Sequence, residues 1–167
     1  MTQNYRKNLV KAYLKRLKLK KEIKNYYLKK TILVTGGAGA IGINLVTALS
    51  ELVGENGMII VLDNLSAIKG NEPVDFPDLN NVLFVKGDVT SDIDLKRVFR
   101  EKPDIVFHLS AFFANQNSVD FPENSSNTDI NGIIKILDYS QFTGVDRFIY
   151  ASSGCAIYGS YGKMPLK

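Results

Sequence analysis

Short apolar runs and amphipathic segments alternate along most of the chain. Apolar runs short enough for buried strands occur at 31–35, 58–62, 82–85, 105–109 and 148–151. Apolar residues recur at helical spacing in 41–52, 92–102 and 128–142. This alternation predicts an α/β fold, a doubly wound parallel sheet with helices on both faces. In the last helix we expect four residues to face inward: Ile130, Ile133, Ile134 and Leu137.

Residues 1–30 differ from the rest of the chain in both pattern and charge. Apolar residues share a helical face whose phase shifts after residue 17: Leu9, Val10, Tyr13, Leu14 and Leu17, then Leu19, Ile23, Tyr26 and Tyr27. This segment holds 11 of the 21 basic residues and one acid, so its net charge is +10, whereas the remainder carries −6. We predict a basic helical extension (1–30) ahead of the main domain (31–167).

Two interpretations of the extension stay open. The favoured one is a helix whose Val10, Leu14 and Leu17 pack on the domain or on a partner subunit, with its lysines in solvent. The alternative is a basic amphipathic helix on an anionic membrane surface. Nucleic-acid binding by the extension, or its disorder, is less favoured than either, and the acidic main domain argues against a broad nucleic-acid surface on that domain.

The remaining composition indicates in which compartment the protein resides and whether a metal site is expected. The single cysteine, Cys155, rules out an intrachain disulfide and fits a reducing, cytoplasmic environment. The longest apolar run, 58–62, is far shorter than the ~20 residues that span a bilayer. The single histidine, His108, lies inside an apolar strand and is expected to be a packing residue. One histidine and one cysteine form no metal-ligand cluster, so no metal is expected.

Three glycines spaced by two residues, Gly36, Gly39 and Gly42, follow the first strand and open the first helix of the main domain. Glycine permits the tight turn and lets backbone approach a pyrophosphate, and the helix N-terminus offers free N–H groups to that anion. This context predicts a dinucleotide site of the Rossmann type.

Acidic residues follow the second and third strands. Asp63 lies 21 residues after Gly42, where a carboxylate accepts hydrogen bonds from the adenosine ribose and would repel a 2′-phosphate. The only close cation is Lys69, so we expect NAD rather than NADP. Asp88 is placed to accept from the adenine amino group while Val89 packs on the ring.

These segments together resemble the extended short-chain dehydrogenase/reductase family, in particular its nucleotide-sugar epimerases and dehydratases. The resemblance covers about residues 31–162 and rests on six segments in the family's order: ILVTGGAGAIG (32–42), VLDNLS (61–66), GDV (87–89), HLSAFFANQNSV (108–119), NGIIKIL (131–137) and FIYASSGCAIYG (148–159). It implies further cofactor contacts from Ala40, Ile41, Asn64, Leu109, Ser110, Ala111 and Phe112. It also implies a homodimer formed through the helix at 128–142.

The resemblance implies that Ser153 is the catalytic hydroxyl beside the reacting sugar oxygen, with Ser152 as the weaker candidate. Two positions depart from the family. Asp129 stands where an asparagine is usual, and Phe113 stands where bacterial UDP-galactose 4-epimerases carry a lysine, which argues against that subgroup.

The family's Tyr-x-x-x-Lys motif, whose tyrosine is the general base, is expected about two dozen residues beyond Ser153. The sequence stops at Lys167, before this motif, the sixth strand and the sugar-binding lobe. We therefore expect a Rossmann domain that is incomplete at its C-terminal side, a fragment or a truncated product. The implied function is that of the NAD-binding part of an enzyme that oxidises a sugar hydroxyl transiently. The alternative is a non-catalytic NAD-binding sensor or scaffold.

Overall fold

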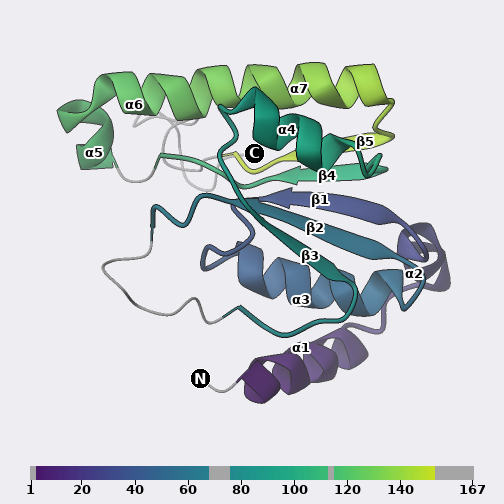
Figure 1. Ribbon diagram of the computed structural model, residues 1–167. Helices are drawn as coiled ribbons and strands as arrows, with labels where there is room; N and C mark the ends of the chain where they lie inside the picture. Colours follow the sequence, from purple (N-terminus) through teal and green to yellow (C-terminus); the bar gives the residue numbers. More distant parts are fainter. Residues whose placement is uncertain (1–2, 68–75, 113–114, 153–167) are drawn as a thin grey trace, which may run out of the picture.

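The computed structural model describes residues 3–67, 76–112 and 115–152, which form one parallel sheet with helices on both faces (Figure 1). The strand order is β3-β2-β1-β4-β5. The strands are β1 (Thr31–Thr35), β2 (Met58–Asp63), β3 (Val82–Lys86), β4 (Ile105–His108) and β5 (Arg147–Tyr150). Every adjacent pair is parallel, which confirms the doubly wound sheet predicted from the sequence.

Helix α3 (Gly42–Val53) covers one face of the sheet, and α4 (Asp92–Phe99) and α7 (Gly132–Thr143) cover the other (Figure 1). Successive residues of β1 point to opposite faces, as strand geometry requires. Ile32 and Val34 pack in the core beneath α3, whereas Leu33 packs with Leu95 of α4 and Ile136 of α7. The apolar runs were continuous because both faces of the sheet are buried.

Three short helical segments precede α7: α5 (Asn115–Asp120), α6 (Pro122–Ser126) and the π-helix η1 (Asn127–Asn131). The first two were not predicted from the sequence, because polar residues dominate them and they lack the apolar period that marks a helix. The third falls within the helix predicted at 128–142, which begins as a π-helix.

The prediction of which residues of the 128–142 helix face inward was wrong at Ile130 of η1 and at Ile134 and Leu137 of α7, which are exposed. The row that meets the core is instead Gly132, Ile136 and Ser140, with Ile133 half-buried. A Cβ at Gly132 would lie 2.8 Å from Cγ2 of Val89, so a glycine lets α7 approach the loop after β3. Small residues mark this close-packed face, and a hydrophobicity pattern does not detect them.

The extension forms two helices, α1 (Gln3–Leu17) and α2 (Lys21–Tyr27), instead of the continuous one expected. The chain breaks at Lys18, which has a left-handed φ of 46°. Helix α1 packs on α3, and its Val10 and Leu14 are half-buried, whereas Leu17, expected to dock, is exposed. An ion pair from Lys11 to Glu51, at 3.3 Å, adds to this contact. Within the described ranges, no helix is long and apolar enough to cross a membrane.

Candidate cofactor site

The loops that follow β1 and β4 meet at the C-terminal edge of the sheet, where the strand order reverses direction. Gly36, directly after β1, has a φ of 68°, which disfavours any side chain. A Cβ there would lie 2.8 Å from the Ser110 nitrogen and 2.9 Å from the Leu109 carbonyl carbon. Ligands of open parallel sheets bind at this switch point, so the topology places the candidate site here.

The N-terminus of α3 presents free backbone donors at this point. Its N-cap residue, Ile41, supplies no side-chain hydrogen bond, and its first turn carries no acidic residue. In the described part of the chain, the N–H groups of Ala40, Ile41 and Gly42 donate to no protein acceptor. A Cβ at Gly42 would collide with the Gly36 carbonyl, so glycine allows the helix to begin this close to the strand. The result is an uncapped helix end suited to a pyrophosphate.

Asp63, the last residue of β2, turns its carboxylate toward the glycine loop. Its Oδ2 accepts the N–H of Ala38 at 2.9 Å, and its Oδ1 accepts the N–H of Leu65 at 2.8 Å. A carboxylate has about four lone-pair sites, so the two oxygens can each accept one further donor. Asp63 is therefore fixed in place with capacity left for a diol, as the predicted ribose contact requires.

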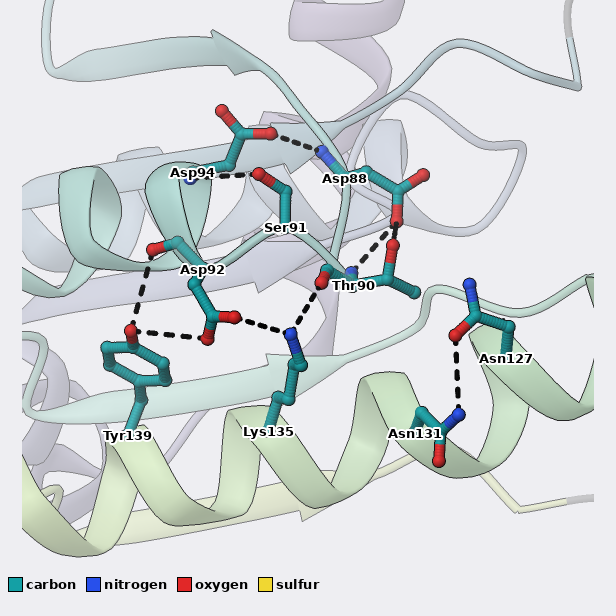
Figure 2. Close-up of polar contacts among 9 residues, drawn as sticks. All are labelled: Asp88, Thr90, Ser91, Asp92, Asp94, Asn127, Asn131, Lys135 and Tyr139. Atoms are coloured by element: carbon teal, nitrogen blue, oxygen red, sulfur yellow. Dashed lines mark hydrogen bonds and ion pairs between the residues drawn. The ribbon is translucent and has the colours of Figure 1, made fainter.

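Asp88, after β3, is held by a network of short hydrogen bonds (Figure 2). Its Oδ1 accepts the N–H and the hydroxyl of Thr90 at 2.9 and 2.7 Å, and its Oδ2 accepts the Asn64 amide at 2.7 Å. Burial alone would raise the pKa of Asp88, but these hydrogen bonds outweigh it and hold the pKa below its ordinary value. Asp88 thus stays an anionic acceptor and joins the loops after β2 and β3.

Helix α7 anchors the same loop from the other side (Figure 2). Lys135 donates to the Thr90 carbonyl at 2.8 Å and to Oδ2 of Asp92 at 2.6 Å. The main-chain N–H of Asp88 donates to Oδ2 of Asp94 at 3.0 Å. Sequence reasoning did not identify Lys135, because a lone lysine on a helix gives no sign of the loop that it reaches.

Thr35, the last residue of β1, connects β4 to the loop that follows it. Its hydroxyl oxygen accepts the N–H of Ser110 at 3.3 Å and lies 2.7 Å from Nδ1 of His108. The His108 ring is 2% exposed and stacks on Tyr150 with 5.8 Å between ring centroids. Desolvation lowers the pKa of His108 to about 4, although the nearby charge of Asp129 acts to raise it. A neutral, packed histidine agrees with the role expected from the sequence.

Asp129, the departure from the family's asparagine, holds the far end of this loop. Its Oδ1 accepts the N–H of Phe112 at 2.7 Å, and its Oδ2 accepts the Ser125 hydroxyl at 2.9 Å. The residue therefore positions the loop between Leu109 and Phe112 by accepting hydrogen bonds, a task that needs no donor.

The expected cofactor residues gather at the C-terminal edge of the sheet, on the loops after β1, β2, β3 and β4. Val89 is only 4% exposed and packs in the core, so its expected contact with an adenine ring stays a prediction. Ser152 follows β5 and is exposed, whereas Ser153, Phe113 and Lys69 lie outside the described residues. The residues that the structure describes contain no group of three metal-ligating side chains.

Comparison with known proteins places this geometry in a family. The model of the NAD dependent epimerase/dehydratase family matches residues 32–167. A UDP-glucose 4-epimerase from Mycolicibacterium smegmatis is 32% identical over 77% of this chain and 40% of its own length.

Solved structures agree with this result. An epimerase from Methanothermobacter thermautotrophicus has a TM-score of 0.80 and 47% identity, covering 87% of this chain and 42% of its own. A UDP-glucose 4-epimerase from Thermus thermophilus, in complex with NAD, has a TM-score of 0.65 and 32% identity, covering 80% of this chain and 41% of its own. The chain spans about two fifths of the length of these relatives. The family match agrees with the expected cofactor, NAD, and this chain belongs to the NAD-dependent epimerase/dehydratase family.

Proposed function

We propose that this chain is the NAD-binding part of a nucleotide-sugar epimerase that acts by transient oxidation of a sugar hydroxyl. The observation that supports it most is the uncapped N-terminus of α3 facing the fixed carboxylate of Asp63 at the switch point of the sheet. Bound NAD supplies a hydride acceptor that later returns the hydride, so the cofactor is regenerated.

Each loop has a separate task in this proposal. The free N–H groups of 40–42 bind the pyrophosphate, and Asp63 accepts the hydroxyls of the adenosine ribose. Asp88, held anionic, accepts a hydrogen bond from the adenine amino group. Asn64, which donates to Asp88, lies on the same side of the adenine site. The segment 109–112, fixed by Thr35 and Asp129, lies along the nicotinamide half. Ser153 hydrogen-bonds the reacting sugar oxygen and relays its proton to the general base.

The substrate proposed is a UDP-hexose, and the reaction an epimerisation in preference to a dehydration. The support comes from the relatives, which are UDP-glucose 4-epimerases. Phe113 stands where bacterial UDP-galactose 4-epimerases carry a lysine, which argues against that subgroup. The proposal therefore names the substrate class, a UDP-hexose, and tests UDP-glucose as its first member. The cytoplasm is the compartment proposed.

We also propose a homodimer formed through the outer face of η1 and α7. Ile130, Ile134 and Leu137 are spaced by four and three residues, so they form one exposed apolar stripe. A contiguous apolar stripe, unlike single exposed apolar residues, favours association with another protein surface. Light scattering should detect self-association that Ile134→Lys abolishes, with Ile93→Lys on α4 as the exposed control. A wild-type monomer at high concentration would contradict this.

The complete protein that contains this chain is the object of the test. It should interconvert UDP-glucose and its 4-epimer without net consumption of NAD, as measured by chromatography of the sugar nucleotides. Ser153→Ala should lower kcat strongly while the affinity for NAD stays nearly unchanged. NAD binding without turnover of UDP-, GDP- or dTDP-sugars would favour the sensor or scaffold instead.

A further inference from the structure

Helix α1 carries a second apolar stripe that its contact with α3 leaves uncovered. Tyr5, Leu9, Tyr13 and Leu17 follow one another at steps of four and therefore lie along one side of the helix. They are 52%, 54%, 55% and 47% exposed. The half-buried apolar residues of α1 are Val10 and Leu14, outside the stripe, so the stripe is left uncovered where α1 packs on α3. Figure 1 shows α1 as an outermost element, beyond α3 on the side away from the sheet.

The extension that carries this stripe is strongly basic. The extension carries a net charge of +10 against −6 for the rest of the chain, so the cations are concentrated on this side. Arg16 lies within the helix turn that separates Tyr13 from Leu17. Among the described residues, Lys15 and Lys21 find no ion-pair partner. These cations are therefore available to an external anion.

A groove of about 370 Å³ lies between α1, α2 and α3, and no residue of the stripe lines it. Its lining is mixed: Leu14, Leu19, Leu28, Leu52, Lys15, Lys24, Asn25 and Glu51. Apolar side chains and ammonium groups therefore occur together on this extension, a combination that complements an acyl chain below an anionic headgroup.

We propose that the α1–α2 extension binds an anionic lipid surface. Leucine and tyrosine side chains suit the boundary between headgroups and acyl chains, where an apolar body and a polar tip are both accommodated. Lysines and arginines on the same helix then meet lipid phosphates. A second copy of this face is the wrong partner, because a symmetric contact would bring two segments of +10 together. A nucleic acid would meet the cations but would leave Leu9 and Leu17 in water.

The experiment uses the purified chain and sedimentation with vesicles. Binding to vesicles of phosphatidylglycerol and phosphatidylcholine in equal parts should be at least tenfold stronger than binding to pure phosphatidylcholine. It should fall at least tenfold between low salt and 0.5 M salt, because exposed charges are screened. Leu9→Ser with Leu17→Ser should lower the affinity at least fivefold. The matched control, Ile93→Ser, removes a side chain that is 81% exposed on α4 and should change nothing.

A charge pair separates the contribution of the cations. Lys15→Gln with Lys21→Gln should weaken binding to the anionic vesicles, whereas Lys86→Gln with Lys96→Gln, on the main domain, should not. Circular dichroism checks that every variant is folded. Failure of the wild type to sediment, equal binding to neutral vesicles, or preferential binding to an RNA oligonucleotide would each overturn the proposal. Since NAD binding is measured independently, none of these results bears on the cofactor site.

Discussion

The hydroxyl of Thr35 lies 2.7 Å from Nδ1 of His108 and accepts the N–H of Ser110. When the hydroxyl donates its only hydrogen to His108, Nδ1 is an acceptor and Nε2 carries the proton of the neutral ring. One side chain thus fixes the histidine tautomer and the start of the loop after β4. Burial penalises the charged form of this ring, which lowers the pKa of His108.

Stability should therefore depend on pH through His108. Its pKa is about 4 in the folded protein and near 6.5 unfolded, so between these values the unfolded chain binds more protons. The free energy of unfolding should fall by about 3 kcal/mol from this group as pH drops from 6.5 to 4. Urea denaturation at several pH values measures it. His108→Gln should flatten that slope, and an unchanged slope would show that other groups carry it.

Asp129 should tolerate replacement by asparagine but not by an apolar residue. Asp129→Asn can still accept the N–H of Phe112 through its carbonyl while its amide donates to Ser125. Asp129→Leu leaves that N–H unpaired and should cost about 1–3 kcal/mol. The control, Asp120→Asn, changes an exposed carboxylate on α5.

The Asp129→Asn variant should also change the titration of His108. The charge of Asp129 raises the pKa of His108, so Asp129→Asn should lower that pKa further. NMR titration of the single histidine detects the shift. A rise in the His108 pKa would contradict the arrangement of these two residues.

Gly36 and Gly144 offer a matched comparison for the glycine loop. Both have a positive φ, of 68° and 75°, but a Cβ at Gly36 would approach Ser110 within 2.8 Å, whereas the space around Gly144 is open. Gly144→Ala should cost only about 1–2 kcal/mol of backbone strain. Gly36→Ala should cost more and should weaken NAD binding at least tenfold. Equal effects on NAD affinity would show that the loop does not contact the cofactor.

The 167-residue chain alone should bind NAD but should not turn over sugar nucleotides. Loss of a general base lowers a rate by a factor of roughly 10²–10⁴. Loss of substrate positioning forfeits about 7–11 kcal/mol more in favourable cases. Chromatography after incubation with UDP-glucose measures it, with the complete protein alongside. Comparable turnover by the chain alone would show that the active site lies elsewhere.

The sheet was predictable because its signals are local. Each strand is an apolar run, and the glycine spacing after β1 identifies a phosphate-binding turn without knowledge of the rest of the fold. Asp63 could be found for the same reason, since its distance from Gly42 along the chain is a property of one βαβ unit.

What the sequence did not predict depends on contacts between distant segments. Lys135 reaches Thr90 across 45 positions, and Thr35 meets His108 across 73, so neither partner is visible locally. The inward face of α7 was assigned wrongly because packing is closest at Gly132 and Ser140, which carry little hydrophobic signal. The break at Lys18 coincides with the shift in helical phase after residue 17, a signal that is equally compatible with one continuous helix.

Calorimetric titration of the purified chain with NAD and with NADP tests the central claim most directly, with Asp63→Asn beside the wild type and Asp78→Asn as the exposed control. The wild type and the control should bind NAD at least tenfold more tightly than NADP, because the Asp63 carboxylate accepts the ribose hydroxyls and repels a 2′-phosphate. Asp63→Asn should weaken NAD binding and narrow that difference. Equal or tighter binding of NADP by the wild type would contradict the account.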